Sequence, residues 1–167
     1  MAFTAHMFTK FTNSAKLGST MTSDSFRVIL LNGTYATLSA GLVTIEDTAA
    51  TMTDVKAASG YAEVTTALGG SNYTQNANST SSGLAISSPT WTLAGHVYTW
   101  TTATNPSWTT AGSAFNPGFA VFFDSQGGTD ATNIPICWWD FGAAQPGTGG
   151  NYTLQIAGTG IFTATSS

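Results

Sequence analysis

The residues of this chain best suited to act as a nucleophile or a base are one cysteine and two histidines. His6 and His96 lie far apart in the sequence, and Cys137 lies between Ile136 and Trp138. Acyl transfer needs a nucleophile beside a base, and none of the three has the local context of a nucleophile elbow. The histidines also lack the spacing of a zinc site. We therefore expect an inert buried thiol at Cys137, a packed or edge position for His96, and no catalytic or metal-binding residue among them.

Carboxylates are a second source of chemistry, because a glycosidase needs only two of them at a suitable separation. The candidates in the middle of the chain and near expected strand ends are Glu46, Asp47, Asp54, Glu63, Asp124, Asp130 and Asp140. Any two of these can meet in three dimensions, but no pattern singles out a pair, and exposed carboxylates are usually solvated. The sequence predicts that the protein is not an enzyme and needs no cofactor.

The segment Asp124–Asp130 is rich in oxygen ligands and glycine, as calcium loops are. Its spacing matches no known calcium loop, and it lies between two expected strands. We predict a β-hairpin loop here, and the sequence leaves open whether that loop binds calcium.

Five tryptophans on a β-rich chain raise the possibility of carbohydrate binding, because sugars stack on exposed indole faces. We expect Trp100 and Trp138 to pack in the core. Trp91, Trp108 and Trp139 are the candidate exposed aromatics. A carbohydrate-binding module is therefore an alternative function, with a glycan as its partner.

An apolar stripe near the N-terminus consists of Phe3, Met7, Phe8 and Phe11, at spacings of three and four. This periodicity predicts a helix over residues 3–17, within an N-terminal arm of residues 1–18. The helix can pack on its own domain or dock on a neighbouring subunit, and the spacing does not separate the two. The four residues are our candidate partner interface.

The rest of the chain has the pattern of short strands separated by Gly, Pro, Asn and Ser. The expected strands are 26–31, 61–68, 84–87, 90–93, 96–101, 119–123, 134–141, 152–157 and 161–165, with a helical turn over 53–59, an otherwise irregular segment 36–60, a polar loop 69–83 and a hairpin turn at 158–160. Residues 119–123 and 134–141 are apolar on both faces, which predicts two central strands. We predict a single all-β domain over 1–167, an Ig-like or jelly-roll-like β-sandwich over 24–167 preceded by the short N-terminal helix.

Charge is scarce in this chain, at 7% of residues against about 25% in a typical protein. Four Lys or Arg residues cannot neutralise a run of phosphates, which argues against nucleic acid and anionic membranes as partners. The 42% of hydrophobic residues is ample for a core. Because charged residues are so few, the exterior must be built largely of Thr, Ser, Asn and Gln. These side chains carry no charge, so there is little electrostatic repulsion to keep copies of the protein apart.

Several segments, taken in order, resemble a family of small structural proteins of tailed bacteriophages. They are Phe26–Leu31, Gly60-Tyr61, the region of Trp108, Phe119–Asp124, Ile134–Gly142 with its Asp-Phe-Gly end, and Tyr152–Phe162 with its Gly-Ile-Phe end. The order and spacing of these motifs carry the resemblance, which spans most of the chain. The long segment 36–60 and the loop 69–83 depart from the family pattern.

The resemblance implies a virion component without catalytic residues. Our expectation is a capsid decoration or minor capsid protein, bound in many copies to the outer face of the shell and assembled in the host cytoplasm. Its partners would be the major capsid protein and copies of itself, as a homo-oligomer. A tail-tip or fibre protein is the alternative within the particle.

Overall fold

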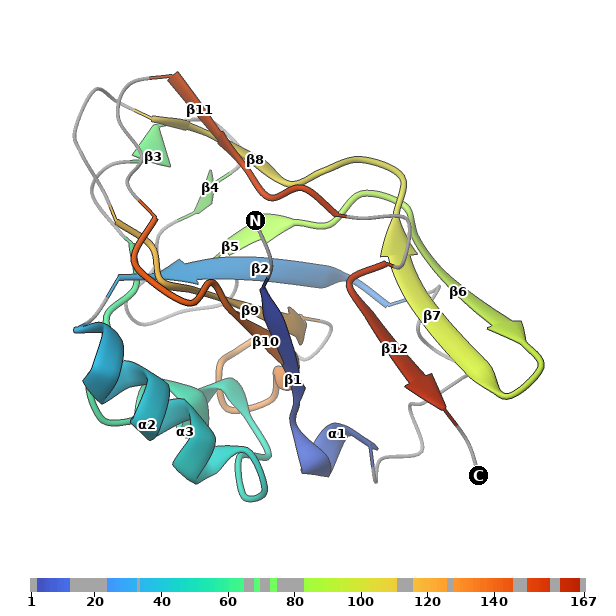
Figure 1. Ribbon diagram of the computed structural model, residues 1–167, viewed down its shortest axis with the longest axis horizontal. Coiled ribbons are helices and arrows are strands. Elements are labelled where there is room, and N and C mark those ends of the chain that lie inside the picture. Colours follow the sequence, from blue (N-terminus) through green and yellow to red (C-terminus); the bar gives the residue numbers. More distant parts are fainter. Residues whose placement is uncertain are drawn as a thin grey trace.

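The computed structural model describes residues 3–12, 24–32, 34–64, 68–69, 73–74, 83–110, 116–125, 128–145, 150–156 and 160–165. These residues form an all-β fold with short helices, as the sequence predicts. The paired strands run antiparallel and belong to three sheets (Figure 1). None of the helices in this part of the chain is both long and apolar enough to cross a membrane.

The main sheet has six strands in the order β1-β10-β9-β2-β5-β4. In that order their bounds are β1 (Thr4–Met7), β10 (Ile134–Asp140), β9 (Phe119–Asp124), β2 (Phe26–Leu31), β5 (Gly83–Ala85) and β4 (Tyr73–Thr74). Every residue of β9 is buried, and so is the interior of β10. The prediction that these two strands are central is confirmed.

Two smaller sheets of three strands each complete the β structure. The β8 sheet contains β11 (Gly150–Thr153), β8 (Ser107–Thr110) and β3 (Leu68–Gly69), and the β7 sheet contains β12 (Phe162–Thr165), β7 (Val97–Thr102) and β6 (Pro89–Ala94). The hairpin of β6 and β7 extends away from the body of the molecule (Figure 1).

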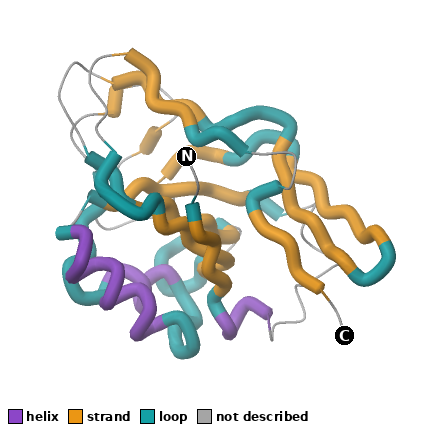
Figure 2. The backbone as a smooth tube through the Cα atoms, viewed as in Figure 1, coloured by secondary structure: helices purple, strands orange, loops and turns teal. Residues whose placement is uncertain are grey.

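The helices gather on one side of the main sheet (Figure 2). They are α1 (Thr9–Thr12), α2 (Tyr35–Ile45) and α3 (Met52–Lys56). Side chains alternate between the two faces of a strand. On the helix side, Phe119 of β9 stacks on Tyr35 with ring centroids 5.0 Å apart. Phe119 also lies 5.9 Å from Trp138 of β10.

The opposite face of the main sheet packs against the β7 sheet through aromatic rings. Trp100 of β7 is fully buried, and its ring meets Phe26 edge-on at 5.1 Å and Phe122 at 6.3 Å. Phe122 in turn lies 4.9 Å from Trp139. Contact between the inner faces of two sheets is the defining feature of sandwich packing.

The N-terminal segment differs from the predicted helix over 3–17. Residues 4–7 form a strand, only 9–12 are helical, and 13–17 lie outside the described residues. β1 pairs with β10 in the register His6↔Trp138. This pairing satisfies the backbone hydrogen-bonding groups at one edge of the main sheet. The stabilisation it provides outweighs the weak helix preference that the spacing of the apolar residues indicates.

The middle of the chain contains a helix that the sequence did not reveal. α2 spans much of the segment expected to be irregular. The sequence did not predict this helix because its Thr, Val, Ile and Gly residues have low helix propensity. Its buried Leu38, Gly41 and Leu42 form a stripe that tertiary packing stabilises. The predicted turn over 53–59 is confirmed in part by α3, with Met52 and Val55 buried.

The predicted hairpin at 158–160 is wrong. β11 pairs with β8 and β12 pairs with β7, so the last two strands belong to different sheets. Residues 157–159 themselves lie outside the described residues, as does most of the predicted polar loop 69–83. The expected strand over 61–68 is represented by an isolated bridge between Glu63 and Leu31 and by β3 at its end.

Candidate functional site

The apolar stripe near the N-terminus is packed within the chain. Phe8 is fully buried and Phe11 is 1% exposed, while Phe3 and Met7 are partly buried against the same core. The Phe3 ring stacks on Trp139 with centroids 3.9 Å apart. Of the two alternatives that the spacing left open, the structure shows the stripe packed on its own domain, so these four residues are not a free partner interface.

Two of the three candidate exposed tryptophans are also in the core. Trp108 is 2% exposed and Trp139 is 1% exposed, and the indole of Trp139 donates a hydrogen bond of 2.9 Å to the Ile161 carbonyl. Trp91 is half-buried and stacks on Tyr98 at 5.3 Å. Trp108 and Trp139 thus present no indole face to a sugar, and the expectation that they are exposed is wrong.

A histidine–carboxylate pair joins β1 to the end of α2. The Nδ1 atom of His6 lies 2.9 Å from the Glu46 carboxylate, and the imidazole stacks on Trp138 at 4.0 Å with an angle of 8° between the rings. Such a pair can activate a nucleophile. The two contacts tie β1 to the end of α2 and to β10.

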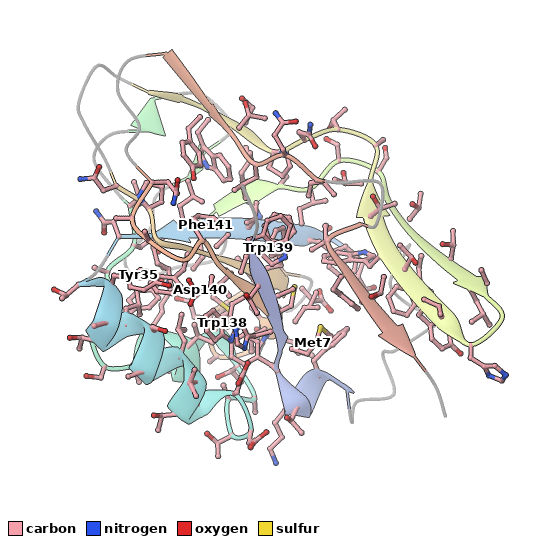
Figure 3. The ribbon with its side chains drawn as sticks, in the orientation of Figure 1. Met7, Tyr35, Trp138, Trp139, Asp140 and Phe141 are labelled. Carbon is pink, nitrogen blue, oxygen red and sulfur yellow. The ribbon has the colours of Figure 1, made fainter. Side chains whose placement is uncertain are left out.

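Tyr35 and Asp140 lie side by side where β10 ends near the start of α2 (Figure 3). The phenol of Tyr35 donates to Asp140 Oδ1, and the same oxygen accepts the Gly142 N–H at 2.7 Å. Desolvation, together with the hydrogen bond to the negatively charged Asp140, raises the pKa of Tyr35 to about 12. Two donors hold the carboxylate, which therefore fixes α2 to the sheet.

The Tyr35–Asp140 contact predicts a measurable titration. A folded chain keeps the Tyr35 proton that an unfolded chain loses near pH 10, so this residue stabilises the fold below pH 10, and its contribution is lost as the pH rises toward 12. Asp140→Asn should lower the pKa of Tyr35, as seen in the tyrosinate absorbance. Tyr152, whose pKa burial alone raises to about 12, serves as the internal control. Identical titration curves for the variant and the wild type would contradict the assignment.

The loop between β9 and β10 is a hairpin loop, as predicted. Its Asp130 carboxylate lies 2.6 Å from Lys56 Nζ, and the Asp130 carbonyl accepts the Thr53 N–H at 3.1 Å. These bonds tie the loop to α3. Across the described ranges, no group of three or more His, Cys, Asp or Glu residues is placed to hold a metal ion.

The thiol of Cys137 is fully buried on β10, and desolvation raises its pKa well above the ordinary value. A thiol held in its neutral form is a poor nucleophile. The prediction that Cys137 is buried is therefore confirmed.

The exposed large apolar side chains of the described residues lie on α2 and on the β6–β7 hairpin. On the hairpin they are Leu93 at 56% and Val97 at 38%, and on α2 the residue is Val43 at 52%. Residues 83–110, which include the whole hairpin, contain no Asp, Glu, Lys or Arg. The alternation of Tyr98 and Trp100 with Val97 and Thr99 predicts a strand, but it does not tell which end of a hairpin leaves the core.

These observations make the β6–β7 hairpin the candidate functional site: an uncharged, projecting surface suited to contact with another protein. Compared with known proteins, the chain matches no protein-family model, no curated protein and no solved structure.

Proposed function

We propose that this chain is a structural protein of a tailed-bacteriophage particle, bound in many copies to the outer face of the capsid shell as a decoration or minor capsid protein. The observation that carries the proposal is the projecting β6–β7 hairpin, which bears exposed Leu93 and Val97 and no formal charge. The ordered resemblance of the strand segments to phage structural proteins supports it independently.

An uncharged surface suits a protein that has permanent neighbours. Exposed charges keep copies of a protein apart and must be desolvated when a contact forms. The surface of the hairpin consists instead of threonine, alanine and apolar side chains, with His96 at its tip. On a shell with many equivalent positions, a modest contact area for each copy is sufficient, because linked contacts multiply their effect.

The carbohydrate-binding alternative loses its main support, since exposed indole faces would favour it and both Trp108 and Trp139 are buried. We therefore propose no glycan partner. A tail-tip or fibre protein would need the same kind of uncharged contact surface. The binding experiment below distinguishes this alternative from a capsid protein.

Purified chain should bind to preassembled capsid shells that lack it and should raise the temperature at which they fall apart, by mass action on the assembled state. Co-sedimentation measures the binding, and calorimetry measures the heat resistance. A photo-reactive residue at His96 should cross-link to the major capsid protein or to another copy of the chain. Binding to tails alone, or to glycans alone, would overturn the capsid assignment.

A further inference from the structure

β6 forms one edge of the β7 sheet. Among the described residues, no strand pairs with its outer side, because the sheet order is β12-β7-β6. Four of its six residues are exposed, and Pro89 and Trp91 are half-buried. An open edge of this kind presents unpaired backbone donors and acceptors to any strand that can lie beside it.

The turn that joins β6 to β7 determines which backbone groups point outward. Gly95 and His96 form a two-residue turn, and Gly95 has a φ of 62°. In such hairpins the residues beside the turn, here Ala94 and Val97, exchange backbone hydrogen bonds, and bonded pairs then alternate along the ladder. The N–H and C=O groups of Trp91 and Leu93 therefore point away from β7, toward the open side.

The usual protection of an edge strand is missing from β6. Proteins commonly protect such edges with lysine, with inward-pointing charges or with proline. β6 has proline only at its first residue, and no charged residue occurs from 83 to 110. A neighbouring strand would thus meet neither like-charge repulsion nor a buried, unpaired charge.

The side chains of β6 are complementary to a second β6 strand. Trp91 and Leu93 share one face of the hairpin with Tyr98 and Trp100, which lie opposite them on β7. Thr90, Thr92 and Ala94 lie on the other face. An antiparallel copy of β6 centred on Thr92 would set Trp91 opposite Leu93 of the second copy and Thr90 opposite its Ala94. Apolar residues then meet apolar residues, and small residues meet small residues.

We propose that β6 pairs antiparallel with β6 of a second copy of this chain, about a two-fold axis at Thr92. In this register the outward backbone groups of Trp91 meet those of Leu93 in the second copy, as a hydrogen-bonded pair requires. The second copy's Trp91 covers Leu93, the most exposed large apolar residue of the described chain at 56%. The contact is isologous, so it closes at two copies.

This pairing deepens the proposed function, and its biological role rests on that function, because a particle would hold copies of the chain at a high local concentration. One strand pair buries little area, so the free chain should dimerise weakly, with a dissociation constant on the order of 100 µM. On a shell, the same contact would be reinforced by attachment of both copies.

A cysteine at the proposed axis provides the sharpest test. Two Thr92 residues facing each other as a non-hydrogen-bonded pair would have Cα atoms about 4.5 Å apart, within the range that a disulfide spans. Two Thr90 residues would be offset by about 14 Å along the strands, beyond that range. Thr90 and Thr92 are both exposed on the same face, and the native Cys137 is buried. Thr92→Cys and Thr90→Cys are therefore matched variants.

Under mild oxidation, Thr92→Cys should form a covalent dimer roughly ten-fold faster or more than Thr90→Cys. Equal rates, or no dimer from Thr92→Cys, would overturn the proposed register. The test uses the free chain without a capsid, so failure here leaves the capsid assignment standing, and failure to bind capsids leaves this pairing standing.

Sedimentation of the free chain supplies the second measurement. The wild type should shift from monomer toward dimer as its concentration rises. Thr92→Lys, which would place two lysines opposite each other, should weaken the dimer by about ten-fold or more. Thr163→Lys, on the exposed surface of β12 in the same sheet, should leave it unchanged. A wild type that stays monomeric, or a dimer that Thr92→Lys leaves intact, would show that β6 does not pair with itself.

Discussion

Truncation of Phe8 to alanine should lower the free energy of unfolding of the isolated chain by about 3–5 kcal/mol. Phe8 is fully buried, and its backbone N–H donates to the Ile136 carbonyl at 3.0 Å. Removing the ring leaves a cavity beside β10. β10 cannot move to close this cavity, because it is held by backbone pairing to β1 on one side and to β9 on the other. Chemical denaturation of the purified chain measures the effect.

Because a loss of this size can unfold a marginally stable domain, Phe8→Leu gives a milder version of the same test. Val43→Ala is the control, since Val43 is 52% exposed on α2 and its truncation should change stability by less than about 0.5 kcal/mol. If Phe8→Ala left the isolated chain as stable as the wild type but abolished its binding to particles, the N-terminal arm would be a docking element after all.

Gly160→Ala should destabilise the chain by about 2–5 kcal/mol, as the sum of backbone strain and a steric clash. Gly160 has a φ of +85°, which disfavours any residue with a side chain. A Cβ at this position would lie 2.4 Å from the Trp100 carbonyl oxygen. That oxygen belongs to the backbone and accepts the Ile161 N–H, so it cannot easily move. Thermal unfolding of the variant measures the loss.

Gly142→Ala separates the two causes. Gly142 has a similar φ of +75°, but a Cβ there would meet nothing within 4 Å. Its replacement should cost only the backbone term, about 1–2 kcal/mol. Equal losses of stability for the two variants would mean that the backbone around Gly160 and β7 shifts to accommodate the added methyl group without a measurable cost.

The strands were predictable because their signals are local. The runs at 26–31, 119–123 and 134–141 combine β-branched and aromatic residues with apolar side chains on both faces, and they became β2, β9 and β10 at the centre of the main sheet. The loop between β9 and β10 was predictable for the same reason, since two strong strands are joined there by Gly, Ser and Asp.

The N-terminus and α2 were not predictable, because their secondary structure depends on distant contacts. Residues 4–7 adopt a strand because β10 offers them an open edge, and His6 then stacks on Trp138. α2 is a helix despite weak propensity because Leu38 and Leu42 bury themselves in the core. The local sequence contains no information about the free edge of β10 or about the core against which α2 packs.

The candidate site divides in the same way. The scarcity of charge and the absence of a nucleophile beside a base in sequence follow from residue identity, and they favour an assembly role over a catalytic one. Which aromatic residues are available for contact depended on tertiary structure. Trp108 and Trp139 are buried because neighbouring elements close over them, whereas Leu93 is exposed because the β6–β7 hairpin extends beyond the sheet that covers Trp100. Burial is a property of what packs around a side chain, so the sequence determined the chemistry of this surface and only the fold determined where it lies.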